Sequence, residues 1–463
     1  MVRRSDVLSN VELLIRNPSS CDWLTQCQIL AILAIGEVYS SRSALPNRPF
    51  PGSHYWARAM ALVYMPSERP QLQLVETYLL LSFYAASMNR RHTSITLAGY
   101  AVRLCVILGL HIDISEMQMR DPALREHRCR LWWTAYRLDR AWCSRIGWPP
   151  SIPDESVEIR FPSNEGIPEE AKTDFEDAQY IIAAIKLAKM HNHAVLTLYV
   201  RKRQPTSFSE RVQVAVRALR DWANSLPEHL GVNSSGTESI ASHILYLHLA
   251  YNQAVIVITR PILLHLLRQR HAQTNNDTPA VVLSESARSL AAACIQCARQ
   301  SMSWLKRIWA DGTFQTFDYY SMQFLFSSAT ILALSSCMQE PGSVSDREDF
   351  SLACSFLQQL ERSGNFGAME FCTHFDAIQR VLSENLAPSG SMGDISATIA
   401  THNTPRGMND ITPPIQLPSM PGAPLQDFLN QSNLDLDFVE MGGQWVDWQD
   451  VFWPQIDLPA TLP

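Results

Sequence analysis

Apolar residues recur at helical spacing along most of this chain, from about Val11 to Leu386. The segments "CQILAILAIGEVY", "LVETYLLLSFYAAS" and "ITLAGYAVRLCVILGL" are rich in Leu, Ala and Ile, and "ILYLHLAYNQAVIVITRPILLHLLRQ" repeats the pattern further along. Apolar positions three or four residues apart lie on one face of a helix. Alternating strand patterns bounded by paired turns are hard to find. The sequence therefore predicts an all-α fold.

Stretches rich in Pro and Gly interrupt this helical pattern. "LPNRPFPGSHYW" separates two early helices, and "GWPPSIPDESVEIRFPSNEGIPEE" is expected to form a long non-helical crossing. We find no repeat of fixed period, so a regular solenoid is not supported. We predict one large helical domain over residues 11–386.

The character of the chain changes after Leu386. Residues 387–424 contain seven prolines and little periodic apolar content, which is typical of a disordered linker. Residues 425–463 then interleave seven acidic residues with six large aromatic residues, without a Lys or Arg. These aromatic residues are Phe428, Phe438, Trp445, Trp448, Phe452 and Trp453. We predict a disordered, acidic and aromatic tail.

The net charge of −7 is concentrated in this C-terminal part. Residues 386–463 contain nine acidic residues and one basic residue, which leaves the helical body near +1. A general polyanion binder would carry a basic stripe, so the near-neutral body argues against that class.

The sequence also bears on location. "MVRRSDVLSNVELLIRNP" has no apolar run before Asp6, so we expect no signal peptide. Apolar runs such as "ILAILAIG" are far shorter than the roughly 18 residues of a membrane span, and we expect no membrane partner. Most of the ten cysteines fall inside apolar helical patterns, and we interpret them as buried, reduced thiols. These features favour a cytosolic or nuclear location.

We find no motif of catalysis or metal binding. H-E-x-x-H, G-x-S-x-G, a phosphate loop and a dinucleotide fingerprint do not occur, so we expect no enzyme activity and no catalytic or metal-ligating residue. Cys294 and Cys297 lack a second C-x-x-C, and we interpret them as buried small residues. His191 and His193 diverge by roughly 200° on a helix, so a shared metal is not expected. "DFEDAQ", at residues 174–179, is interpreted as the start of a solvated helix.

A segment with two adjacent tryptophans and many arginines begins near residue 121. Asp121 can cap a helix there, with Pro122 at its first position. Glu126 and Arg130 are four residues apart and can pair, with Arg128 as a neighbour of the same cluster.

Trp132 and Trp133 follow this charged cluster. We interpret them as core anchors of an amphipathic helix. The alternative, a surface on which nucleic-acid bases stack, would need a net basic neighbourhood that the body lacks.

These segments resemble the regulatory middle homology region of fungal-specific transcription factors, which belong to the binuclear zinc-cluster family. The resemblance covers roughly residues 27–267. It rests on a helix ending in Leu-Gly-Leu-His, an acidic residue with an arginine run and an aromatic pair, an aspartate–arginine pair, a glycine-x-proline turn, and an arginine–proline pair after a later helix. In this sequence these are Leu108, Gly109, Leu110, His111, Glu126, Arg128, Arg130, Trp132, Trp133, Asp139, Arg140, Gly147, Pro149, Arg260 and Pro261. The resemblance implies a structural role for these residues.

Proteins of that family also carry six closely spaced cysteines, which bind two zinc ions and place a short helix in the major groove. This sequence has no such cluster. We therefore expect that the DNA-binding part is missing from this sequence, or that the protein works without it. Zinc is expected only in the first case, and no cofactor is assigned to this chain.

The resemblance implies a nuclear regulator of RNA polymerase II transcription in a fungus, acting in a metabolic or secondary-metabolite pathway. The implied partners are coactivators bound by the acidic tail, DNA bound through a missing or separate module, and a second copy or a relative in a dimer. A small-molecule effector is compatible with this role because helical bundles offer interior pockets. The alternative is an accessory or antagonist protein that acts by protein–protein contact without binding DNA.

Two segments can each be interpreted in two ways. Arg201, Lys202 and Arg203 form either a nuclear import signal or the basic end of a helix, where cations favour the dipole. The tail at 425–463 either activates transcription, because acidic residues keep its aromatic residues exposed for a coactivator groove, or docks on its own domain. We favour activation.

Overall fold

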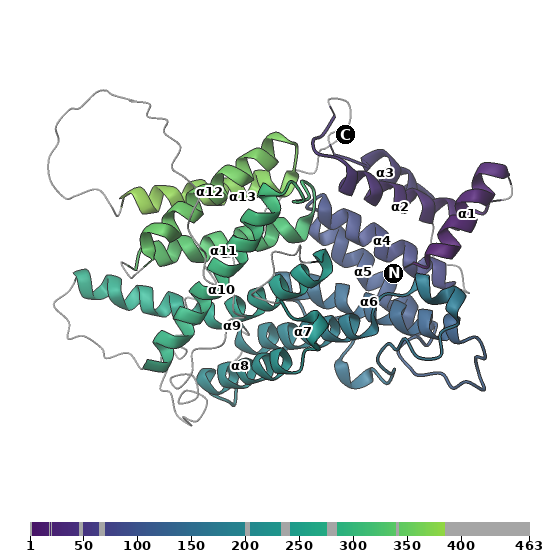
Figure 1. The fold of residues 1–463 in the computed structure, drawn as a ribbon, viewed down its shortest axis with the longest axis horizontal. Coiled ribbons are helices and arrows are strands. Elements are labelled where there is room, and N and C mark those ends of the chain that lie inside the picture. The colour runs from purple at the N-terminus through teal and green to yellow at the C-terminus, as the bar shows by residue number, and fades with distance from the viewer. Residues whose placement is uncertain are drawn as a thin grey trace.

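The computed structural model describes residues 2–17, 19, 21–45, 50–63, 70–199, 204–232, 241–275, 285–338 and 342–384. Every regular element in these ranges is a helix, which confirms the prediction of an all-α fold (Figure 1). The basic tripeptide at 201–203, the linker at 387–424 and the tail at 425–463 lie outside the described residues.

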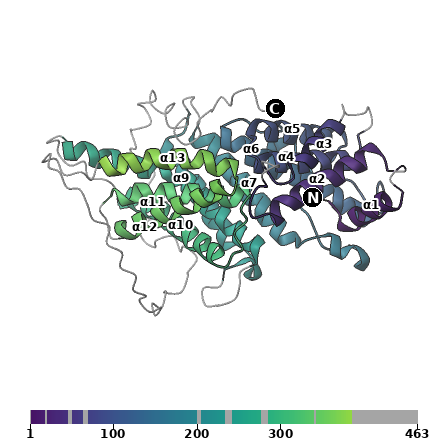
Figure 2. The same cartoon turned by 90° about the horizontal axis from the view of Figure 1, so that it is seen from above.

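The helices follow one another along the chain and pack mainly on their sequence neighbours. The first six are α1 (Arg4–Arg16), α2 (Trp23–Ser40), α3 (Ser53–Leu62), α4 (Leu72–Ser87), α5 (Arg91–Ile107) and α6 (Pro122–Ile146). The others are α7 (Ala178–Leu198), α8 (Phe208–Asn224), α9 (Ser242–Asn275), α10 (Glu285–Ala310), α11 (Tyr319–Ser336), α12 (Ser343–Arg362) and α13 (Phe366–Glu384). Helices α1–α5 gather at one end of the molecule and α10–α13 at the other, with α7 between them (Figures 1 and 2).

Helix α1 begins seven residues before the expected start of the helical body at Val11. None of its residues is buried. Its start is held by Asp174, whose carboxylate accepts the backbone N–H of Ser5 at 2.9 Å.

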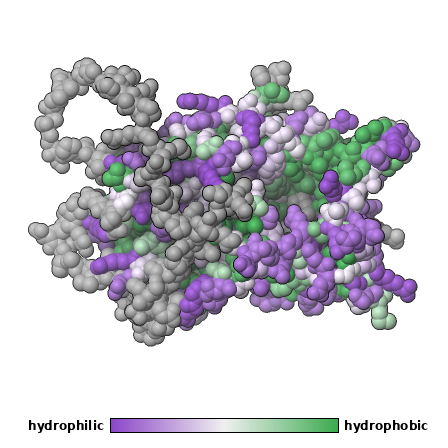
Figure 3. All heavy atoms as spheres, viewed as in Figure 1, coloured by the Kyte–Doolittle hydropathy of each residue, from purple (hydrophilic) through white to green (hydrophobic). Residues whose placement is uncertain are grey.

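Apolar side chains of α1 and α2 are exposed at this end of the molecule (Figure 3). Among them are Leu8, Ile15 and Leu33. An apolar surface of this kind is typical of a contact with another protein.

Helix α6 has the boundaries that its sequence predicts. The Asp121 carboxylate accepts the backbone N–H groups of Ala123 and Leu124 at 3.0 and 3.2 Å, with Pro122 at the first helical position. The helix ends at Gly147, whose φ of +66° lies in the left-handed region that favours glycine. These caps orient 25 residues of α6 as one continuous element.

Helix α9 contains Pro261 in its interior, so the arginine–proline pair does not follow a helix as expected. A proline lacks the N–H that would bond to the carbonyl four residues earlier, here that of Val257. The Tyr199 hydroxyl donates to this carbonyl oxygen at 2.6 Å, and the same hydroxyl accepts from Arg260 at 3.1 Å. This hydrogen bond compensates for the one that Pro261 removes, which explains why the helix continues.

Residues 242–270 of α9 are long and apolar enough to cross a membrane by length and composition, the one such stretch among the described residues. The uninterrupted apolar runs of the sequence did not reveal this stretch, because polar residues divide it into shorter runs. In this stretch 78% of the most apolar window is buried inside the protein, as is typical of the central helix of a helical core.

The core extends from α2 to α13 and includes most of the cysteines. Nine of the ten cysteines are buried, and Cys337 is exposed. Burial raises the pKa of the Cys294 thiol to about 12 and also raises the pKa of Cys297. This confirms the interpretation of both residues as buried thiols, since a thiolate is the reactive form.

A partly buried ion pair joins the N-terminal helices to α13. The Glu370 carboxylate on α13 accepts from the Arg91 guanidinium at 2.5 Å and from the Asn89 amide at 2.6 Å. Burial alone would raise the pKa of this carboxyl, but the neighbouring His374, Arg91 and Asn89 lower it to about 2.

Replacing Glu370 by glutamine should therefore reduce stability in a pH-dependent way. The pKa is lower in the folded state than in the unfolded state, so the carboxylate stabilises the fold fully above about pH 4.5 and loses this effect as the pH falls towards 2. We expect a loss of about 3 kcal/mol at pH 7. Urea unfolding at pH 7, 4 and 3 should show the difference from wild type narrowing with acid. The exposed Glu348→Gln should show no such trend, and a constant difference across pH would contradict the prediction.

Candidate functional site

The motif residues of α6 hold the long crossing that follows this helix. The Glu126 carboxylate accepts the backbone N–H of Ser163 at 3.0 Å and the side chain of Arg130 at 2.7 Å. The Arg130 guanidinium donates onward to the backbone carbonyl of Glu176 at 2.7 Å. The predicted pair of Glu126 and Arg130 is thus present, and it binds the crossing at Ser163 and the segment just after it at Glu176.

The next turns of α6 hold the earlier part of the crossing. The Trp133 indole donates to the carbonyl of Arg160 at 2.9 Å, and its ring stacks on Phe161. Trp132 is completely buried. Both tryptophans are core residues, which argues against a base-stacking surface.

The aspartate–arginine pair completes this set of contacts. The Asp139 carboxylate accepts the backbone N–H of Ser151 at 2.9 Å. Arg140 donates to the carbonyl of Ile152 at 2.8 Å and to Asp154 at 2.7 Å, and its guanidinium lies 3.4 Å from the centre of the Tyr136 ring. The motif therefore fixes a loop that has no regular structure of its own over most of its length.

Arg128 does not join the Glu126 cluster as expected. Its guanidinium donates to the carbonyl of Leu108 at the end of α5, at 2.9 Å. Two residues apart on a helix point to nearly opposite sides, which separates Arg128 from both Glu126 and Arg130.

The Leu-Gly-Leu-His turn lies beside this contact. Gly109 has a φ of +67°, and Leu110 is buried. The His111 ring packs near Trp132, and its carbonyl accepts the N–H of Glu158 at 2.9 Å. Gly147 ends α6, and the exposed Pro149 lies just beyond it.

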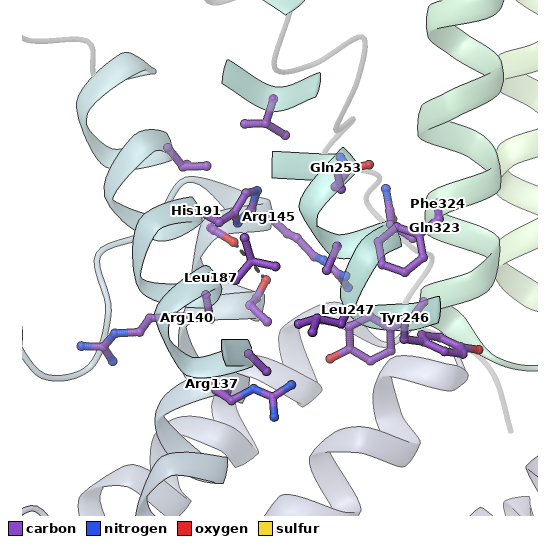
Figure 4. Close-up of a pocket in the computed structure, with 18 of the residues that line it drawn as sticks. Arg137, Arg140, Arg145, Leu187, His191, Tyr246, Leu247, Gln253, Gln323 and Phe324 are labelled. Atoms are coloured by element: carbon purple, nitrogen blue, oxygen red, sulfur yellow. Dashed lines mark hydrogen bonds between the residues drawn. The ribbon is translucent and has the colours of Figure 1, made fainter. Parts of the chain in front are cut away.

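A large cavity also lies beside α6, and Arg140 contributes both to its wall and to the contacts with the crossing. Its volume is about 1160 Å³, enough for an organic molecule of ordinary drug size. Its walls come from α6, α7, α9 and α11, with single residues from α2, α4 and α10. Figure 4 shows Arg145 and His191 together on one wall, with Gln253, Gln323 and Phe324 across from them.

One carboxylate lines this cavity among the described residues, that of Asp318. It accepts the Tyr39 hydroxyl at 3.1 Å, the Tyr246 hydroxyl at 2.7 Å and the backbone N–H of Ser321 at the start of α11 at 2.8 Å. Burial, and then the charge of Asp318, raise the pKa of both Tyr39 and Tyr246. These tyrosines therefore remain neutral donors to the carboxylate.

The cavity walls are otherwise rich in basic side chains. Five arginines and three histidines contribute, namely Arg137, Arg140, Arg145, Arg260, Arg268, His191, His243 and His265. Burial, and then the charges of Arg145 and Arg260, lower the pKa of His191 to about 4. The His191 ring is therefore neutral at pH 7 and can donate or accept a hydrogen bond.

Sequence reasoning considered His191 only as a metal ligand and did not find this site. The divergence of His191 from His193 is confirmed, since His193 is exposed while His191 faces the cavity. A spacing rule could not find the cavity because its members come from four main helices far apart in the sequence. Within the described ranges, no three His, Cys, Asp or Glu side chains are placed to hold a metal ion.

The buried motif contacts are those of a helical scaffold rather than of a nucleic-acid groove. Residues 16–224 match the model of the Fungal specific transcription factor domain, which spans α2 to the end of α8. This part of the chain is therefore a fungal specific transcription factor domain, as the resemblance of its motifs implied.

Curated relatives carry names of the same class. The chain is 27% identical over 325 residues to an uncharacterized transcriptional regulatory protein of Schizosaccharomyces pombe, covering 68% of this chain and 39% of that protein. It is 25% identical over 358 residues to an ABC-transporter-regulating transcription factor of Aspergillus fumigatus (71% and 38%). It is 25% identical over 266 residues to the Activator of stress genes 1 of Saccharomyces cerevisiae (54% and 27%).

The first two of these alignments span about two fifths of the length of the relatives. No solved structure matches the chain. The matched family model and the names of these relatives are those of regulators of transcription, a class that is generally not enzymatic.

Proposed function

We propose that this protein regulates RNA polymerase II transcription in a fungal nucleus, with the helical body as its regulatory domain. The observation that carries the proposal is the domain at residues 16–224 together with the regulator names of its relatives. The near-neutral charge of the body supports assigning DNA contact to a separate module, such as a zinc cluster outside these residues or a partner chain. The exposed apolar side chains of α1 and α2 support contact with a second copy or a relative.

The activating part of the protein, in this proposal, is residues 425–463. Seven acidic residues surround six large aromatic residues there, and no base neutralises them. Aromatic side chains in such a segment gain free energy when they enter an apolar groove on a partner, and the acidic residues keep the segment soluble before binding. A coactivator with an apolar groove and a basic rim is the partner that fits this chemistry.

The full chain fused to a heterologous DNA-binding domain should therefore activate a reporter gene. Replacing Trp445, Trp448, Phe452 and Trp453 by alanine should abolish activation, because the apolar contacts supply most of the binding free energy. Replacing the acidic residues by asparagine should weaken activation more gradually, since charge mainly steers association. Reporter output is the measurement, with protein levels compared by immunoblot.

A matched control carries four substitutions in the linker instead: Pro413, Pro414, Pro418 and Pro421 to alanine. This variant should activate like the parent. An inert parent fusion, or an aromatic variant as active as the parent, would contradict the proposal and favour an accessory protein acting by protein–protein contact.

A further inference from the structure

The cavity between α6, α7, α9 and α11 contains cationic groups without carboxylate partners among the described residues. Arg140 is paired with Asp154, and Asp318 is already held by two tyrosines and a helix N-terminus. Arg137 and Arg145 form no ion pair with any described residue. The cavity therefore has an excess of positive charge, and an anion entering it would be attracted.

The Arg145 guanidinium is the main contributor to this excess of positive charge. This guanidinium lies 4.8 Å from the ring centre of Trp142 and 4.6 and 5.0 Å from those of Tyr319 and Tyr320. These rings position the guanidinium without neutralising its charge. Its Nη1 atom is buried and has no hydrogen-bond partner in the described part of the protein. A buried donor without a partner is costly, and a ligand oxygen would relieve that cost.

Other charged side chains lie near Arg145 in the cavity. The charges of Arg145 and Arg260 both act on His191, and those of Arg145 and Arg137 both act on Tyr320. Arg145 therefore shares its part of the cavity with Arg260 near His191, and with Arg137 and the carboxylate of Asp318 near Tyr320. The His191 Nε2 atom there also lacks a hydrogen-bond partner in the described ranges.

The rest of the cavity wall combines polar and apolar side chains. The Gln323 side-chain oxygen is buried and has no hydrogen-bond partner among the described residues, and Figure 4 shows Gln323 across the cavity from Arg145. An amide offers a ligand both a donor and an acceptor. Leu187, Leu247 and Phe324 lie on the walls, so the body of a ligand would meet apolar side chains.

We propose that this cavity binds a small organic anion, with a carboxylate or phosphate group held by Arg145 and its neighbours and an apolar or aromatic body along α9 and α11. Arginine suits this role because its planar fork donates two parallel hydrogen bonds to either anionic group. The inference deepens the proposed function by naming the class of effector, but binding itself does not depend on transcription.

Two fluorescent probes that differ only in one anionic group test this proposal. They are 8-anilinonaphthalene-1-sulfonate and its uncharged analogue N-phenyl-1-naphthylamine, each titrated into the full chain. We expect the sulfonate to bind at one site, with higher affinity than the neutral probe. Competition with 3-phenylpropionate and with phenyl phosphate distinguishes a carboxylate site from a phosphate site. Displacement by either supports the proposal, and displacement by neither overturns it.

Replacing Arg145 by methionine removes the charge and keeps an apolar side chain against the three rings. Affinity for the sulfonate should fall about ten- to a hundredfold, because a hydrogen bond to a charged group is lost, while affinity for the neutral probe should stay within about twofold. The exposed Arg103→Met on α5 is the matched control and should bind both probes like wild type. An Arg145→Met protein that binds the sulfonate like wild type would overturn the proposal.

A second variant covers the case in which loss of Arg145 disturbs the fold. Ala188 on α7 lines the cavity, and Ala188→Trp should occupy the space where the ligand body lies. Both probes should then lose binding, with helix content by circular dichroism unchanged. Retained sulfonate binding would place the probe elsewhere and overturn the proposal. An inert reporter fusion alongside intact probe binding would count against the proposed function alone.

Discussion

Replacing Trp132 by alanine should cost the helical body about 3–5 kcal/mol of unfolding free energy, among the largest effects available to one substitution. The side chain is completely buried. Its ring contacts His111 at the end of α5 and Tyr136 one turn along α6. The substitution leaves a cavity at the junction of two helices, which neighbouring side chains cannot fill without moving the helices. Thermal and urea unfolding followed by circular dichroism would measure the loss.

The exposed Trp148 provides a matched control, because it lies just after the same helix and is 48% exposed. Trp148→Ala should change the free energy of unfolding by about 0.5 kcal/mol or less. Equal stability of the Trp132 and Trp148 variants would show that Trp132 is a surface contact and not a core anchor.

Replacing Arg140 by methionine should lower the free energy of unfolding by a similar amount, about 3–5 kcal/mol. Arg140 is 1% exposed, and Asp139 beside it is 2% exposed. Removing the guanidinium leaves the Asp139 carboxylate buried beside a neutral residue and frees the Ile152 carbonyl of its donor. The crossing should then detach from α6, and urea unfolding would measure the lost stability.

A second substitution tests this explanation. Adding Asp139→Asn to Arg140→Met removes the unpaired charge and should recover part of the lost stability. The exposed Arg103→Met serves as the control for loss of an arginine and should be nearly neutral. No recovery in the double variant would mean that lost packing, rather than the unpaired carboxylate, dominates.

The sequence was sufficient for the features that depend on neighbours along the chain. The caps of α6, the Glu126–Arg130 pair and the buried tryptophans follow from local spacing, and the structure has all of them. Helical periodicity likewise predicted the fold class, because the buried face of an amphipathic helix carries apolar residues in every turn.

Features that depend on distant residues could not be predicted in this way. Pro261 lies within α9 because Tyr199, about 60 residues earlier, donates to the carbonyl that the proline leaves free. His191 faces a cavity because α7 packs on both α6 and α9. Arg128 bonds to the carbonyl of Leu108 in another helix. None of these partners has a fixed spacing from the residue it serves.

The cavity has one wall inside the fungal specific transcription factor domain and another beyond it. Helices α6 and α7 belong to residues 16–224, whereas α9 and α11 follow the end of that match. If the cavity binds an anion as proposed, substitutions in α9 and α11 alone could exchange one ligand for another. The α6 contacts that hold the crossing would be untouched by such changes. In the proposed model of effector binding, a change of ligand would thereby be separated from preservation of the helical architecture.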